Sequence, residues 1–324
     1  MKTFFKVLGG LVTVVLVLWG VRAYNLNYYA IPGPDVTDRG DALTHGGESV
    51  DGDYLRGIHY RPDAADSYPG MVIIFGGSEG SAGDAQARQL AAQGFDVLAL
   101  YYFGQQGQPK SLSEVPLDFF REALDWIDKH QEQSGPLTVI GTSKGAELTA
   151  NLAVRYPEID HIVLYTPSEY TYAGLQFESN EQTSSFTWQG QPLPFAEFPF
   201  DAGMIGRMIL GLPVSYRSTY EDAARQAPLD ARIDIGRFDG EGLLLAGDAD
   251  AMWQGDIAAR ALAAQNPRLE PHIFPGAGHL FAEDIAAYGN SWETMLGGTV
   301  EGNRQAKQES DRLLLAHLSR WHDE

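Results

Sequence analysis

The chain has 324 residues, a formal net charge of −20 at pH 7, and 44% hydrophobic residues. This length and composition fit one large globular domain with additions, and the strong acidity argues against nucleic acid as a partner. Because the chain contains no cysteine, disulfides, thiolate metal sites and a cysteine nucleophile are excluded.

The first residues differ in kind from the rest. Lys2 and Lys6 precede an almost uninterrupted apolar run from Val7 to Val21, so residues 4–21 are about long enough to cross a bilayer as a helix. We expect residues 1–23 to be a membrane anchor, with a cleaved signal peptide and a buried core helix as alternatives. Positive charge precedes the run and acidic residues follow it, so we expect the catalytic domain to be extracytoplasmic, or secreted if the segment is cleaved.

Residues 24–52 are rich in glycine, proline and aspartate, which is typical of a linker. In residues 53–324, apolar runs of strand length alternate with segments of helical periodicity. The predicted strands are 54–60, 71–75, 95–101, 137–140, 162–165, 242–246 and 272–274, and the predicted helices are 84–93, a segment beginning at Pro116, 144–156 and 303–321. Repeated strand–helix units predict a mainly parallel central sheet flanked by helices on both faces.

One stretch interrupts this alternation. Residues 166–238 are aromatic and irregular, with an apolar segment from Met204 to Leu212. An insertion after a core strand is typical of a cap over a ligand site. The alternative is a structural excursion that closes the core.

Two segments match the pattern G-x-S-x-G, which is typical of a serine nucleophile. One contains Ser78 in residues 76–80, and the other contains Ser143 in residues 141–145. A nucleophile elbow needs a strand, a sharp turn and an immediate helix. A helical sequence starts directly at Lys144, whereas glycines after Ser78 delay any helix. Ser143 is therefore the predicted nucleophile.

The glycines after the strand at 71–75 then take another role. The first amide of an oxyanion hole belongs to the residue after the nucleophile, here Lys144. The second comes from the loop after an early strand, which points to Gly77 or Ser78. A plain glycine turn is the alternative for this loop.

In this fold, the acid follows the nucleophile along the chain, and the histidine that acts as the base comes after the acid. His279 lies in a glycine loop after the last predicted strand, as a general base should. Asp250 follows the strand at 242–246 and is the predicted acid, with Asp248 as its rival and Asp256 as a weaker candidate. With Ser143, this order predicts an α/β-hydrolase fold.

Several segments in the same order resemble the C-terminal catalytic domain of the acyl-CoA thioester hydrolase and bile acid-CoA:amino acid N-acyltransferase family. They are 75–80 (FGGSEG), 101–104 (YYFG), 115–117 (VPL), 141–148 (GTSKGAEL), 185–194 (SFTWQGQPLP), 247–253 (GDADAMW), 276–279 (GAGH) and 296–299 (LGGT). The resemblance runs from about Tyr54 to Trp321 and implies the triad Ser143, Asp250 and His279.

The resemblance implies hydrolysis of an acyl thioester such as an acyl-CoA, or of a carboxylic ester, through an acyl-serine intermediate. No cofactor and no metal are expected for this chemistry. Conjugating members of the family use a cysteine nucleophile, so Ser143 favours hydrolysis. The alternatives are an acyltransferase that uses a small amine or alcohol, and a catalytically silent binding module.

Overall fold

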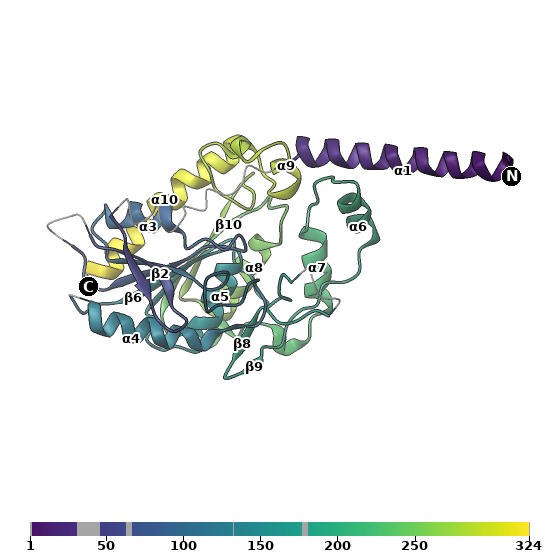
Figure 1. Cartoon of the computed structure of the whole chain (residues 1–324). Coiled ribbons are helices and arrows are strands. Elements are labelled where there is room, and N and C mark those ends of the chain that lie inside the picture. The colour runs from purple at the N-terminus through teal and green to yellow at the C-terminus, as the bar shows by residue number, and fades with distance from the viewer. Residues whose placement is uncertain (1, 31–45, 63–66, 132, 177–180, 324) are drawn as a thin grey trace.

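An eight-stranded sheet forms the centre of the computed structural model, which describes residues 2–30, 46–62, 67–131, 133–176 and 181–323 (Figure 1). In spatial order, its strands are β1 (Glu48–Asp51), β2 (Arg56–Tyr60), β4 (Val97–Tyr101), β3 (Met71–Phe75), β6 (Leu137–Thr142), β7 (His161–Tyr165), β10 (Glu241–Gly247) and β11 (Leu269–Phe274). β2 is antiparallel to both β1 and β4, and all other pairs are parallel. The predicted mainly parallel α/β-hydrolase architecture is confirmed.

The apolar run of β3 is continuous because both faces of the sheet are covered. Met71, Ile73 and Phe75 belong to one core cluster. Val72 and Ile74 alternate with them and belong to the cluster on the other face. A strand buried on both faces needs no polar side, which explains the uninterrupted pattern in the sequence.

Helices cover the two faces in two groups. The first cluster includes residues of α4 (Phe120–His130), α5 (Lys144–Ala153) and α8 (Gly255–Gln265). The second includes residues of α3 (Asp84–Ala91) and α10 (Val300–Asp323). Figure 1 shows α4 and α5 on one side of the sheet, with α3 and α10 on the other.

The segment 166–238 contributes two strands to a second, smaller sheet. In spatial order, the strands of this sheet are β5 (Val115–Pro116), which comes from outside the segment, β8 (Phe186–Trp188) and β9 (Gln191–Pro192). The helices of the segment are α6 (Ala202–Ile209), α7 (Arg217–Gln226), η2 (Leu229–Ala231) and η3 (Ile235–Arg237). The predicted apolar segment Met204–Leu212 forms most of α6, and no residue of α6 is buried. The short elements η1 (Leu117–Phe119), η4 (Ile285–Tyr288) and α9 (Trp292–Met295) lie outside this segment.

The N-terminal helix α1 (Lys2–Tyr28) extends away from the body and meets it beside α6 (Figure 1). Arg22 donates to the carbonyl oxygens of Met208 and Ile209 at 2.8 and 2.7 Å, and Asn25 donates to that of Leu210 at 2.8 Å. These three carbonyls lie at the C-terminal end of α6, where a helix has few partners for its acceptors; that of Met208 also accepts the Gly211 N–H at 3.1 Å.

Across the described ranges, no helix is both long enough and apolar enough to span a membrane. The predicted membrane-anchored, extracytoplasmic location is therefore wrong, and the predicted membrane contact through residues 4–21 is not supported. Side chains are described from residue 12 onward. Much of the predicted linker, residues 31–45, lies outside the described residues, and β1 falls within its last part.

Candidate active site

Ser143 occupies a strained turn between β6 and α5. Its φ of 56° and ψ of −118° lie in a region that side chains rarely adopt, and such strain is typical of a nucleophile elbow. A Cβ on Gly141 would overlap the carbonyl oxygen of Gly145, and a Cβ on Gly145 would overlap that of Gly76. The two glycines therefore allow the strand, the helix and the loop after β3 to pack closely around Ser143.

His279 lies in the loop after β11 and reaches Ser143, the predicted nucleophile. Its Nε2 is 2.8 Å from Ser143 Oγ, within hydrogen-bond distance. The backbone N–H of His279 donates to the carbonyl oxygen of Leu296 at 2.7 Å, which fixes the loop against the segment 296–299. His279 is 4% exposed and Ser143 is 9% exposed, so the pair is nearly enclosed by protein.

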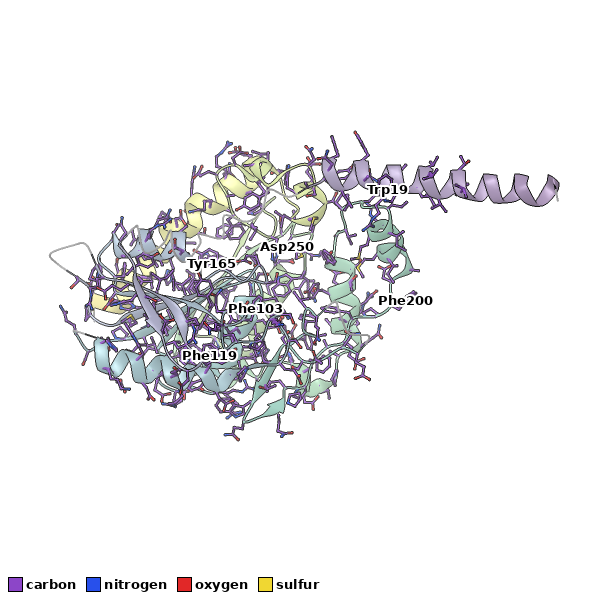
Figure 2. All side chains as sticks on the ribbon, in the orientation of Figure 1. Trp19, Phe103, Phe119, Tyr165, Phe200 and Asp250 are labelled. Carbon is purple, nitrogen blue, oxygen red and sulfur yellow. The ribbon has the colours of Figure 1, made fainter. Side chains whose placement is uncertain are left out.

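Asp250 lies in the loop after β10 (Figure 2). Its Oδ2 is 2.8 Å from His279 Nδ1. Its Oδ1 accepts the backbone N–H groups of Met252 and Trp253 at 2.7 and 3.2 Å. The structure thus brings the predicted serine, histidine and aspartate into one chain of hydrogen bonds.

The rival acids have other partners. Asp248 accepts the backbone N–H of Gly276 at 2.7 Å. Asp256 lies in the first turn of α8 and pairs with Arg217 at 3.0 Å. Neither carboxylate contacts His279 among the described residues.

The predicted oxyanion residues lie next to Ser143. The Lys144 N–H is in the first turn of α5, where no preceding helical carbonyl can accept it. A Cβ on Gly77 would lie 3.4 Å from Ser143 Cβ, so the loop after β3 lies against Ser143. The Gly77 N–H already donates to Glu79 Oε1 at 2.9 Å. The rival nucleophile Ser78 is exposed on this loop, and the next helix begins only at Asp84.

The Lys144 side chain forms a buried ion pair that the motif analysis missed. Its Nζ is 2.7 Å from Glu147 Oε2 and donates to Ser185 Oγ at 2.8 Å. Glu147 Oε1 accepts the backbone N–H of Tyr172 at 3.0 Å. Burial lowers the pKa of Lys144 and raises the pKa of Glu147, and their mutual attraction opposes both effects. The spacing of the two residues, three apart on one helix, was the available signal.

Trp253 is the second neighbour that the sequence did not identify. Its ring meets that of His279 edge-on, with centroids 5.7 Å apart, and its Nε1 donates to the Thr166 carbonyl oxygen at 3.2 Å. Beyond it lies an open cavity of about 590 Å³ between α7, the start of α8 and the segment 167–172. Its walls include Tyr170, Tyr172, Glu221, Arg225, Trp253 and Gln254. Trp253 therefore lies between the imidazole and a cavity of ligand size.

A family model described as BAAT / Acyl-CoA thioester hydrolase C terminal matches residues 115–283. The bile acid-CoA:amino acid N-acyltransferase of Mus musculus is 28% identical over 232 residues, which are 70% of this chain and 52% of that protein. Acyl-coenzyme A thioesterase 1 of Homo sapiens is 27% identical over 244 residues, or 72% and 53% of the two chains. The chain thus spans about half the length of these curated relatives.

Among solved structures, an esterase of Pyrococcus furiosus matches with a TM-score of 0.53 at 16% identity. The match covers 91% of this chain and 99% of that one. At this identity, the likeness supports the α/β-hydrolase fold alone.

Proposed function

Because the chain belongs to the BAAT / acyl-CoA thioester hydrolase family, we propose that it is a serine hydrolase that cleaves an acyl thioester. Ser143 is the proposed nucleophile, His279 the general base and Asp250 the acid that orients it. The hydrogen-bonded chain from Ser143 Oγ through His279 to Asp250 carries this proposal. A base within 3 Å of the hydroxyl, itself held by a buried carboxylate, is the arrangement that activates a serine.

In the first half of the reaction, His279 Nε2 takes the proton from Ser143 Oγ as the oxygen attacks the thioester carbonyl. The carbonyl oxygen becomes an oxyanion, held by the N–H of Lys144 and by a second N–H from Gly77 or Ser78. The carbon–sulfur bond then breaks, and the thiol leaves with a proton from His279. A thiolate is a good leaving group, so this step needs little acid assistance.

In the second half, water replaces the thiol. His279 deprotonates the water as it attacks the acyl-serine, and the imidazolium returns that proton to Ser143 as the acid departs. Asp250 stabilises the imidazolium in both halves without itself taking the proton. The ion pair formed in each half is enclosed, since His279 and Asp250 are both buried.

We also propose that the segment 166–238 acts as a cap and that the cavity beside Trp253 receives part of the substrate. α7, from this segment, forms one wall of the cavity. In this proposal, the cap is an insertion within a hydrolase domain of residues 53–324.

Hydrolysis of a series of substrates tests the reaction class. Acyl-CoAs, simple alkyl thioesters and p-nitrophenyl esters of the same acyl group should be compared with the wild-type chain. We expect the thioesters to be cleaved and Ser143→Ala to abolish both turnover and labelling by a fluorophosphonate. If only the p-nitrophenyl esters were turned over, the protein would be a carboxylesterase and the thioester proposal would be wrong.

A second candidate is transfer of the acyl group to a small amine, because several relatives are named N-acyltransferases. The two activities share the acyl-serine and differ only in what attacks it. Adding amines or amino acids to the assay and measuring the ratio of amide to free acid separates them. We expect free acid to dominate.

A further inference from the structure

Tyr102 follows β4 and lies beneath the loop that abuts the nucleophile. Its side chain is 1% exposed, and its ring packs edge-on against Phe75 and Phe103. The hydroxyl donates to the carbonyl oxygen of Gly77 at 2.9 Å, with the Gly76 carbonyl oxygen further away at 3.4 Å. A buried hydroxyl thus holds one particular peptide group of the loop.

That peptide group joins Gly77 to Ser78. It is planar and trans, so its C=O and N–H point in opposite directions. The Gly77 carbonyl oxygen accepts from Tyr102 and, at 3.3 Å, from the backbone N–H of Gly80. The Ser78 N–H therefore points away from Tyr102.

The neighbouring amide is already engaged. The Gly77 N–H donates to Glu79 Oε1 at 2.9 Å. The Ser78 N–H has no hydrogen-bond acceptor within the described parts of the chain. Of the two candidate amides next to Ser143, the one at Ser78 is thus the one left available to a ligand.

We propose that Tyr102 is a positioning residue: by holding the Gly77 carbonyl, it presents the Ser78 N–H as the second donor of the oxyanion hole. This inference rests on the proposed function, since an oxyanion forms only if Ser143 attacks an acyl group. Donation to a carbonyl also polarises its peptide and strengthens the N–H of the same group as a donor.

Tyr102 remains a donor over the working pH range. Burial raises the pKa of its hydroxyl well above the usual value, and the nearby carboxylates of Glu79 and Glu147 add to the effect. The hydroxyl therefore stays protonated, and able to donate, at neutral pH.

The first test is Tyr102→Phe, with Tyr156→Phe as its matched control. Tyr156 is also buried and donates its hydroxyl to a backbone carbonyl oxygen, that of Leu117 at 3.0 Å, away from the triad. We expect Tyr102→Phe to lower kcat by about 10- to 100-fold, a fraction of the effect of losing an oxyanion donor outright. KM should change little, and Tyr156→Phe should match the wild type in kcat.

Inhibition by a trifluoromethyl ketone analogue of the substrate distinguishes a positioning role from a purely structural one. It adds to Ser143 as a hemiketal whose oxyanion occupies the hole. Its inhibition constant should rise in Tyr102→Phe by the factor by which kcat/KM falls. Equal melting temperatures of the two tyrosine variants would exclude a difference in folding.

The second test removes the proposed donor itself. Ser78 is the second residue of a turn closed by the Gly80 N–H on the Gly77 carbonyl oxygen, a position that favours proline. Ser78→Pro eliminates the N–H at an exposed site, and Ser78→Ala keeps it. We expect kcat of Ser78→Pro to be about 100-fold or more below that of Ser78→Ala.

Two results overturn the inference: Ser78→Pro as active as Ser78→Ala, or Tyr102→Phe as active as Tyr156→Phe with an unchanged inhibition constant. Either result, with an active wild type, leaves the proposed function intact. A wild-type chain that neither turns over esters or thioesters nor binds the ketone would instead contradict the proposed function, and the inference with it.

Discussion

At the scale of single residues, Asp250 divides its carboxylate between two tasks. Oδ2 lies 2.8 Å from His279 Nδ1, while Oδ1 accepts two backbone N–H groups of its own loop. An asparagine at position 250 would keep its side-chain oxygen toward the two backbone N–H groups and turn its NH₂ toward the imidazole. His279 Nδ1 would then have to accept a hydrogen bond from that NH₂, so the ring proton would sit on Nε2. Nε2 must be unprotonated to take the proton from Ser143.

Asp250→Asn is therefore expected to lower kcat by roughly 10³- to 10⁴-fold while the fold is kept. Steady-state hydrolysis of the best thioester measures the loss, and circular dichroism checks the fold. The control is Asp248→Asn, since that side chain accepts the Gly276 N–H, an interaction that an asparagine oxygen can keep. A similar loss in both variants would argue that Asp250 does not orient the base.

At the scale of elements, the ion pair of Lys144 and Glu147 joins α5 to the segment 166–238. Lys144 binds Ser185, and Glu147 binds the backbone of Tyr172. Both charges are fully buried. Removing one partner leaves the other charge without compensation, whereas removing both does not.

Lys144→Met is expected to lower the free energy of unfolding by about 3–5 kcal/mol at pH 7.5. The double variant Lys144→Met/Glu147→Gln should recover much of this, because its neutral amide can still accept the Tyr172 N–H. Chemical denaturation of the three proteins measures the difference. Equal stability of the single and double variants would show that the buried charge of Glu147 is not the cause.

The same single variant should depend on pH in a defined direction. Burial raises the folded-state pKa of Glu147 above its unfolded value, and loss of Lys144 removes an opposing influence. A raised pKa means that the folded state binds the proton more tightly, so stability is gained as pH falls through the folded pKa toward the unfolded one. The difference in melting temperature from the wild type should therefore shrink between pH 7.5 and pH 5. A constant difference would contradict this account.

A second contact between elements concerns α1 and α6. No residue of α6 is buried, so we expect the hydrogen bonds at its C-terminal end to contribute to its position. Arg22 and Asn25 occupy the last carbonyl oxygens of that helix. Figure 2 shows Trp19, on α1, and Phe200, just before α6, at the same outer end of the molecule.

Arg22→Ala/Asn25→Ala is expected to speed hydrogen exchange of the amides of residues 202–211 by about tenfold, equivalent to roughly 1.4 kcal/mol of local opening. The melting temperature of the whole chain should change little, because the sheet does not depend on these bonds. Trp19→Ala is the control, as this side chain is 70% exposed. Unchanged exchange in the double variant would show that α6 holds its position without α1.

At the scale of the whole molecule, the sequence predicted features that depend on local patterns but not those that depend on long-range contacts. The strand Met71–Phe75 and the elbow at Ser143 were predictable because each depends on a short pattern of apolar residues or glycines. The packing of Trp253 against His279 depends on two loops that are remote in the chain, so no local pattern encodes it. The membrane span was predicted from the apolar composition of residues 4–21, and the described part of the N-terminal helix does not support it; the bond from Arg22 to α6 is a long-range contact that composition does not encode.

The net charge of −20 makes a prediction about the whole molecule and its substrate. An acyl-CoA is a polyanion, so the overall field of this protein opposes its approach, whereas a p-nitrophenyl ester is neutral. Salt shortens the screening length from about 30 Å at 0.01 M to about 8 Å at 0.15 M. We therefore expect kcat/KM for an acyl-CoA to rise by up to about tenfold over this range of ionic strength, the low end of electrostatic effects on association rates. The same acyl group on the neutral ester should show no such rise. A fall in the acyl-CoA rate with salt would instead indicate a local cationic surface that binds the coenzyme and outweighs the overall charge.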